Sequence, residues 1–228
     1  GWGRASLYNK ILRKIKKICG TLPSSYYVEQ DCFAFDASLL SMRHDVYMDG
    51  LFINPRYFEN IEDILRKDFA FSVEPNGENT RVAEEINSSN AVGIHVRIGD
   101  YIHNKNIQRL YPVYGKEYYR QAISYIESKV NDPVYYIFSD NPEWAAANLT
   151  FVKNARIISH NSIEKGYEDL RLMSLCKHNI ITNSTFSWWV AWLNRNPDKI
   201  VVAPVKWING KNASDLLLSG WHPIDAAS

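Results

Sequence analysis

The sequence contains few cysteines and no long apolar run, and these two shortages exclude several classes of protein. Its 228 residues include three cysteines, an odd number that shows no metal-ligand spacing. This usage argues against a disulfide framework and favours a reducing compartment. No apolar stretch reaches the length of a membrane span, and no signal-peptide pattern is visible. We therefore expect a cytoplasmic protein.

An excess of charge of one sign is also missing. Lys and Arg number 26 and Asp and Glu number 25, which leaves a net charge of +1. This balance gives no general attraction to a polyanion, so we expect no nucleic-acid partner. Hydrophobic residues make up 46% and charged residues 22%, which is ordinary for a globular protein.

The N-terminal stretch combines a helical pattern with a basic face. Between residues 5 and 19, apolar residues recur at steps of three and four, while lysines and arginines occupy the other face. We favour a solvated basic face; the alternative is a helix peripheral to an anionic surface, such as the inner face of a bacterial membrane. Because the chain starts at Gly1 without a Met and enters this helix with no preceding strand, we expect it to be part of a longer protein.

Residues 1–89 predict an incomplete N-terminal α/β lobe followed by a connector. Within it, Pro55 lies near the first position of a predicted helix, and Asn76-Gly77 marks a turn. The expected elements are short strands at residues 26–29, 32–35 and 45–52, a helix at residues 55–67 and a connecting helix at residues 78–89.

Residues 90–205 alternate regularly between strand and helix. The expected strands are residues 91–96, 134–138, 156–159, 179–182 and 199–203, and the helices between them are residues 116–130, 142–149, 167–176 and 185–195. This alternation predicts an α/β fold with a doubly wound, Rossmann-like parallel sheet. The tail, residues 206–228, has no clear period, and we expect it to pack back on the N-terminal lobe.

Polar side chains follow the strand at residues 91–96. His95 and Arg97 are one residue apart across Val96, so both point to the same side of an extended backbone. The guanidinium of Arg97 suits a phosphate, because its planar fork donates two hydrogen bonds to one anion. The alternative is an ion pair of Arg97 with Asp100 that only holds the loop, and this stretch alone favours neither.

The strand at residues 134–138 is followed by Ser139 and Asp140. The carboxylate of Asp140 is suited to accept hydrogen bonds from the amide-like edge of guanine or from a ribose. Asn141 directly before Pro142 predicts a helix cap, which is the competing structural role for this stretch.

A third polar stretch, Asn183, Ser184, Thr185 and Phe186, lies between a buried strand and an apolar helix. Hydroxyl groups and free backbone N–H groups at a helix start form an anion site, and Phe186 is placed to pack on a base or sugar. Plain helix capping is the alternative for Ser184. Trp188, Trp189 and Trp192 follow at helical spacing and are expected in the core.

These polar stretches all fall at carboxyl ends of strands in one predicted sheet, where open α/β sheets bind ligands. Together they predict a nucleotide diphosphate gripped by Arg97 and by the helix start at Ser184 and Thr185. Such a site needs no metal. No two aspartates are separated by a single residue, so the Asp-x-Asp metal motif is missing, and we expect neither a metal nor another cofactor.

Three motifs resemble those of the α-1,2-fucosyltransferase family, glycosyltransferase family 11. They are His95-Val96-Arg97-Ile98-Gly99-Asp100-Tyr101, Phe138-Ser139-Asp140 and Thr182-Asn183-Ser184-Thr185-Phe186-Ser187-Trp188-Trp189. The resemblance implies a GT-B architecture of two Rossmann-like lobes, with the nucleotide sugar held mainly by the C-terminal one. It also implies inverting, metal-independent transfer of L-fucose from GDP-β-L-fucose to a galactoside hydroxyl, in an α-1,2 linkage, during glycan or surface polysaccharide synthesis.

The family pattern implies a role for each matched residue. Arg97 binds the diphosphate and stabilises the departing GDP, and His95 contacts the nucleotide beside it. Asp140 contacts the guanine side, while Asn183, Ser184, Thr185 and Phe186 hold the phosphates and base, as a similar Ser-Thr-Phe run does in protein O-fucosyltransferases. Asp100 is a candidate general base; alternatively, it orients Arg97.

One segment of the family pattern has no counterpart. Family members begin with a strand and a loop reading Gly-Gly-x-Gly-Asn-Gln, and this sequence contains no such segment. We therefore expect the acceptor side to be incomplete in this chain. The expected partners are GDP-β-L-fucose and a galactose-terminated oligosaccharide; the alternatives are a GDP-sugar-binding module without catalysis and a fucosyltransferase with a different acceptor.

Overall fold

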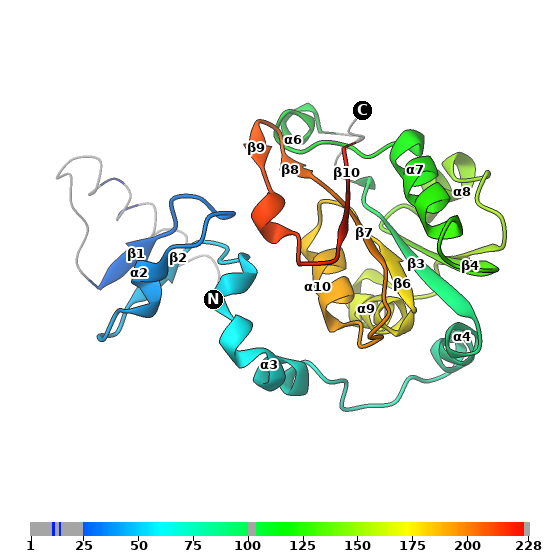
Figure 1. The fold of residues 1–228 in the computed structure, drawn as a ribbon, viewed down its shortest axis with the longest axis horizontal. Coiled ribbons are helices and arrows are strands. Elements are labelled where there is room, and N and C mark those ends of the chain that lie inside the picture. Colours follow the sequence, from blue (N-terminus) through cyan, green and yellow to red (C-terminus); the bar gives the residue numbers. More distant parts are fainter. Residues whose placement is uncertain (1–10, 12–13, 15–24, 100–103, 226–228) are drawn as a thin grey trace. The chain divides into compact units, whose positions relative to one another are not determined.

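The computed structural model describes residues 11 and 14 and the ranges 25–99 and 104–225. Asp100 and most of the expected basic helix at residues 5–19 lie outside the described residues. The chain divides into two compact units, Gly1–Glu62 and Asp63–Ser228, both drawn in Figure 1. The predicted boundaries after residues 89 and 205 divide it differently, because the connecting helix and the tail both belong to the second unit.

The first unit contains a two-stranded parallel sheet of β1 (Tyr26–Val28) and β2 (Tyr47–Asp49). Tyr26 lies opposite Tyr47 in this pairing, and their rings stack with centroids 5.1 Å apart. A short helix, α2 (Ala37–Leu40), begins after Asp36, whose side chain accepts a hydrogen bond from the Ser38 N–H. The predicted strands at residues 26–29 and 45–52 are thus confirmed in shortened form.

Two predictions for this region are wrong. The strand expected at residues 32–35 is absent, because the Asp31 carboxylate accepts a hydrogen bond from the Phe33 N–H at 3.1 Å and bends the backbone locally. The single helix expected at residues 55–67 is divided at Phe58, whose φ of −134° is not helical. It becomes η1 (Pro55–Tyr57), η2 (Glu59–Ile61) and α3 (Glu62–Asp68).

A six-stranded sheet in which every strand pair is parallel forms the centre of the second unit. Its strands are β3 (Asn90–Val96), β4 (Pro133–Ser139), β5 (Ala155–Ile158), β6 (His178–Ile180), β7 (Val201–Pro204) and β10 (His222–Ile224). All five predicted strands are present. The sixth, β10, comes from the tail, for which the sequence predicted no strand; packing of the tail on the N-terminal lobe stays a prediction.

The spatial order of the strands is β10-β7-β6-β3-β4-β5. The chain therefore runs from β3 outward to β5, returns to β6 on the other side of β3, and continues outward to β7 and β10. This is the doubly wound arrangement that the alternating pattern predicted, and its direction reverses between β3 and β6.

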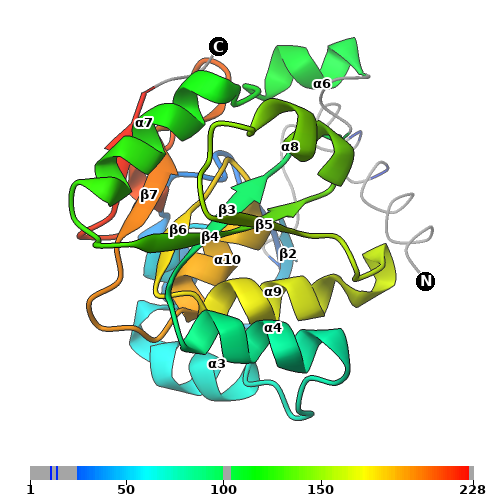
Figure 2. The same ribbon diagram turned by 90° about the vertical axis from the view of Figure 1, so that its right-hand side faces the viewer.

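Helices cover both faces of this sheet, as Figure 2 shows. One face is covered by α7 (Lys116–Glu127) and α8 (Pro142–Asn148), and the other by α4 (Glu78–Asn87), α9 (Gly166–Leu175) and α10 (Thr185–Leu193). The predicted helices are confirmed to within a few residues at each end. The shorter elements are α6 (Lys105–Leu110), η3 (Ile163–Lys165), β8 (Lys206–Ile208), β9 (Lys211–Asn212) and η4 (Ser214–Leu216).

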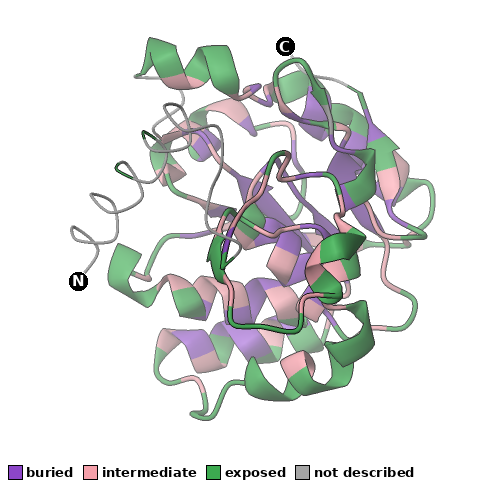
Figure 3. Ribbon diagram, turned by 90° about the vertical axis from the view of Figure 1, so that its left-hand side faces the viewer, coloured by how far each residue is buried: buried purple, intermediate pink, exposed green. Residues whose placement is uncertain are grey.

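The two faces of β3 have different neighbours. On one face, Val92, Ile94 and Val96 are fully buried and pack in the core that includes α7. Figure 3 shows that buried residues are concentrated along the sheet. On the other face, a Cβ at Gly93 would lie 2.8 Å from Met173 Cγ, so glycine allows α9 to approach the sheet. His95 follows Gly93 on this face and reaches the start of α10.

Candidate functional site

A cleft of about 390 Å³ opens at the carboxyl end of the six-stranded sheet. It lies where the winding direction reverses between β3 and β6, the position at which doubly wound sheets bind ligands. Its polar lining comes from the ends of β3, β4 and β5 and from the starts of α9 and α10, and includes His95, Arg97, Ser139, Asp140, Asn161, Asp169 and Ser184.

Arg97 and Asp140 form an ion pair in this cleft. Asp140 Oδ2 lies 2.6 Å from Arg97 Nη1 and accepts a hydrogen bond from the Gly99 N–H at 3.1 Å. Its other oxygen, Oδ1, accepts from the Ile98 N–H at 2.9 Å. A Cβ at Gly99 would lie 2.8 Å from Asp140 Oδ2, so a side chain there would obstruct this approach. Asp140 thus fixes both the guanidinium and the backbone that follows β3.

This arrangement changes the interpretation of two predicted residues. The sequence suggested an ion pair of Arg97 with Asp100, which stays a prediction because Asp100 lies outside the described residues; the described structure shows that Asp140 pairs with Arg97. Asp140 was expected to contact the guanine, and it lines the cleft while both of its oxygens already accept hydrogen bonds from the β3 loop. These contacts do not test the predicted contact of Asp140 with the base, and they add an indirect role through Arg97 as the alternative.

His95 is a buried, uncharged member of the cleft wall. Its ring Nδ1 lies 3.1 Å from Thr182 Oγ1, and its ring centroid lies 5.2 Å from that of Phe186. Burial lowers the pKa of His95 to about 4, with the charge of Arg97 acting in the same direction and Asp140 opposing it. Near neutral pH, His95 therefore offers a hydrogen-bonding ring and an aromatic face rather than a positive charge.

The start of α10 has no side-chain cap. Ser184 is the N-cap residue, yet its hydroxyl accepts no capping hydrogen bond, and Ser184 lines the cleft together with Phe186. The first N–H groups of a helix point out of its end and favour negative charge. The plain capping role considered for Ser184 is therefore not what the structure shows, and the helix start is suited to a phosphate.

Two predicted site residues do not line the cleft. Asn183 is buried, and its Nδ2 donates hydrogen bonds to the carbonyl oxygens of Pro112 at 3.1 Å and Trp207 at 3.3 Å. Asn183 therefore links the loop before α7 to the strand β8. Thr185 is exposed and lies outside the cleft lining.

The tryptophans of α10 lie in or near the core as expected: Trp188 and Trp192 are buried, and Trp188 Nε1 donates to the Leu216 carbonyl at 2.7 Å.

The cleft also contains residues that the sequence reasoning missed. Asn161 Nδ2 donates to Asp169 Oδ1 at 2.8 Å, and burial raises the pKa of Asp169 above its ordinary value. Asn161 is held in turn by a reciprocal pair of amide contacts with Asn79 of α4, at 2.9 and 3.0 Å. His160 Nε2 lies 2.8 Å from the same Asn79 oxygen. This polar network presents Asp169 as a second carboxylate facing the cleft.

A signal for this wall was present in the sequence. His160, Asn161 and Ser162 form a polar run directly after the predicted strand at residues 156–159, as polar residues do at the three strands whose ends were considered. Asp169 gave no such signal, because an acidic residue in the first turn of a helix is ordinarily favoured by the helix dipole.

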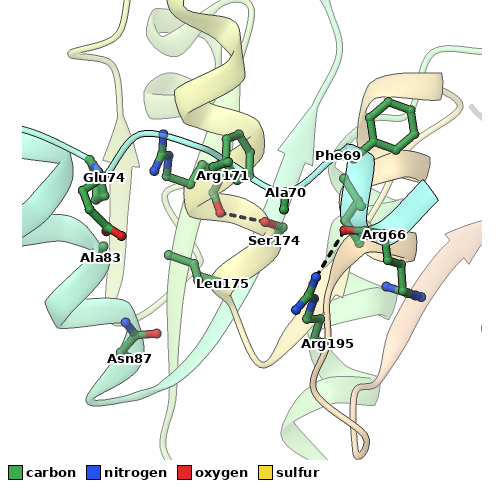
Figure 4. Close-up of a pocket in the computed structure, with 13 residues that line it drawn as sticks. Arg66, Phe69, Ala70, Glu74, Ala83, Asn87, Arg171, Ser174, Leu175 and Arg195 are labelled. Atoms are coloured by element: carbon green, nitrogen blue, oxygen red, sulfur yellow. Dashed lines mark hydrogen bonds between the residues drawn. The ribbon is translucent and has the colours of Figure 1, made fainter. Parts of the chain in front are cut away.

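A second hollow of about 450 Å³ lies elsewhere in the same unit, between the segment after α3 and the ends of α9 and α10 (Figure 4). Three arginines line it, but Arg171 is ion-paired with Glu168 at 3.0 Å, and Arg195 donates to the Arg66 carbonyl at 3.2 Å. Helix C-termini carry partial negative charge, which disfavours an anionic ligand. The cleft at the sheet end is therefore the better diphosphate site.

The described residues contain neither a metal-binding cluster nor a membrane-spanning helix. No three His, Cys, Asp or Glu side chains among them gather closely enough to hold a metal ion. In that same part of the chain, no helix has both the length and the apolar character needed to cross a membrane.

Comparison with known proteins points to a single family. Residues 22–225 match the family described as Glycosyl transferase family 11. The O-antigen biosynthesis glycosyltransferase WbnK of Escherichia coli is 42% identical over 134 residues, which are 59% of this chain and 44% of that protein. An alpha-1,2-colitosyltransferase of Escherichia coli is 33% identical over 191 residues, which are 81% of this chain and 64% of that protein.

More distant relatives come from animals. Galactoside alpha-(1,2)-fucosyltransferase 2 of Sus scrofa is 30% identical over 106 residues, which are 46% of this chain and 31% of that protein. No solved structure matches the chain significantly. The chain thus spans less than two thirds of the length of each of these curated relatives. With the family match covering nearly all of its residues, the chain belongs to glycosyl transferase family 11.

Proposed function

We propose that this protein transfers L-fucose from GDP-β-L-fucose to a galactoside hydroxyl, with inversion, in an α-1,2 linkage and without a metal. One observation carries the proposal: Arg97 and the uncapped start of α10 line the same cleft, which lies where the winding direction of the sheet reverses. Both groups stabilise negative charge, and the departing GDP develops that charge on its β-phosphate.

Other residues of the cleft have complementary roles in this proposal. His95 and Phe186 present ring surface and a neutral hydrogen-bonding group beside the phosphates. Asp169 is an acceptor for N–H groups of the base, since Asn161 leaves lone pairs of that carboxylate for other donors. Asp100 remains the proposed general base or the residue that orients Arg97. The proposed partners are GDP-β-L-fucose and a galactose-terminated oligosaccharide. Peripheral membrane association through residues 5–19 stays the alternative to a solvated basic face.

Replacement of Arg97 by alanine tests the proposal. We expect transfer from GDP-β-L-fucose to lactose to fall by about 100-fold or more, because removal of one donor to a developing oxyanion has that effect. Arg109→Ala, an exposed arginine of α6 outside the cleft, is the matched control and should keep full activity. Full transfer by Arg97→Ala would refute the proposed site, whereas GDP binding by the wild type without any transfer would favour a binding module.

One observation favours a second sugar donor. A relative that covers 81% of the chain is named as an alpha-1,2-colitosyltransferase. Transfer assays should therefore compare GDP-fucose with GDP-colitose, at equal concentration and with the same acceptor. A higher kcat/KM for GDP-colitose would replace fucose in the proposal and leave the nucleotide site unchanged.

A further inference from the structure

Ile163 is a hydrophobic side chain at an unexpected position. It is the first residue of η3, which follows β5, and it lines the cleft. Its side chain is nevertheless 97% exposed, more than any other large hydrophobic residue in the described parts of the chain. A single exposed aliphatic residue is common on protein surfaces, but this one lies on the rim of a ligand-sized cleft.

The cleft wall next to Ile163 is suited to a flat, partly polar group. Ile158 at the end of β5 is 2% exposed and, with Phe138 and Pro142, gives the cleft an apolar lining. Asn161 and Asp169 supply hydrogen-bonding groups in the same cleft. Apolar surface with a few polar groups at its margin is how proteins bind the face and the edge of a nucleobase.

The position of Ile163 along the sheet separates it from the phosphate-binding groups. Arg97 follows β3 and Ser184 follows β6, whereas Ile163 follows β5, the outermost strand on that side. Three strand spacings of about 4.8 Å separate β6 from β5, which gives about 14 Å. An extended nucleoside diphosphate reaches across such a distance, so the cleft is long enough for the phosphates and the base to lie at its opposite ends.

We infer that Ile163 is a nucleoside-positioning residue that covers one face of the bound base, an inference that rests on the proposed nucleotide-sugar site. In the free protein its side chain has almost no protein contact to lose. Contact with a base would remove about half of its surface from water. Half of the free energy gained when an isoleucine side chain is removed from water corresponds to about a fivefold difference in the affinity for the nucleotide.

Calorimetric titration of the 228-residue chain with GDP and with inorganic pyrophosphate tests this inference. We expect Ile163→Ala to weaken GDP binding about fivefold, to leave pyrophosphate binding unchanged and to leave the melting temperature unchanged. Ile163→Leu should bind GDP like the wild type, because the apolar area is retained. Ile64→Ala, an exposed isoleucine of α3 outside the cleft lining, is the matched control.

Each outcome has a separate meaning. Wild-type GDP affinity in Ile163→Ala would overturn the inference and leave the proposed nucleotide site standing. Equal weakening of GDP and pyrophosphate would also overturn it, because Ile163 would then act on the whole cleft rather than on the base. Failure of the wild type to bind GDP would refute the proposed function, and the inference with it.

Discussion

Asp140 is expected to act on the nucleotide through Arg97 rather than by itself. In the structure it orients the Arg97 guanidinium and holds the Ile98 and Gly99 N–H groups. A hydrogen bond to a charged group contributes about 1.5–3 kcal/mol, so Arg97→Ala should weaken GDP binding by about 10- to 100-fold. Asp140→Ala removes this ion-pair partner of the guanidinium, and about 1.5 kcal/mol of binding free energy, or about tenfold, should be lost.

The double variant distinguishes this indirect role from direct contact. With Arg97 already absent, Asp140→Ala should change the GDP dissociation constant by less than about twofold, so the coupling free energy would be about 1.5 kcal/mol. Calorimetry on the four proteins of the cycle measures it. The single Asp140 variant should also melt a few degrees lower, because two backbone hydrogen bonds of about 1 kcal/mol each are lost. Additive effects within about 0.5 kcal/mol would refute the reasoning, since Asp140 would then contact the ligand independently.

Two further predictions concern burial on the same face of β3. His95 has a folded-state pKa of about 4, against an ordinary value of 6.5. Between these two pH values the unfolded chain therefore binds more protons than the folded chain. The free energy of unfolding should fall by about 3 kcal/mol as the pH drops from 6.5 to 4. His95→Asn should flatten that part of the curve of melting temperature against pH, and an unchanged slope would contradict the assignment. Gly93→Ala should destabilise the protein in urea by about 1–3 kcal/mol, because its Cβ would crowd Met173. Gly166→Ala, where a Cβ meets nothing within 4 Å, should cause no such loss.

The alternating pattern of residues 90–205 predicted the large sheet well because buried parallel strands and amphipathic helices leave strong local signals. The tail gave no such signal. β10 has only three residues, one of them a proline, and its place beside β7 depends on pairing with a strand about 20 residues away. In the first unit, a single Asp31 hydrogen bond was enough to replace a predicted strand by a bend.

The site was predictable where polar residues directly follow a strand. His95, Arg97, Asp140, Ser184 and Phe186 all line the cleft, because parallel strands bring their carboxyl ends together. The pairing of Arg97 with Asp140 was not predictable, since it depends on which strands are neighbours. Asn183 was misleading for a similar reason: its carbonyl partners come from segments 71 and 24 residues away.

The position of β10 also affects how the protein behaves at high concentration. β10 is an outer strand of the six-stranded sheet, and its central residue, Pro223, has no N–H to offer a further strand. Its neighbour β7 is buried at all four positions and has the apolar sequence Val201-Val202-Ala203-Pro204. A chain that ended before residue 222 would leave β7 at the edge of the sheet. Its unpaired N–H and C=O groups could then pair with a strand of another molecule. We therefore expect the short tail strand to limit edge-to-edge association of the folded protein.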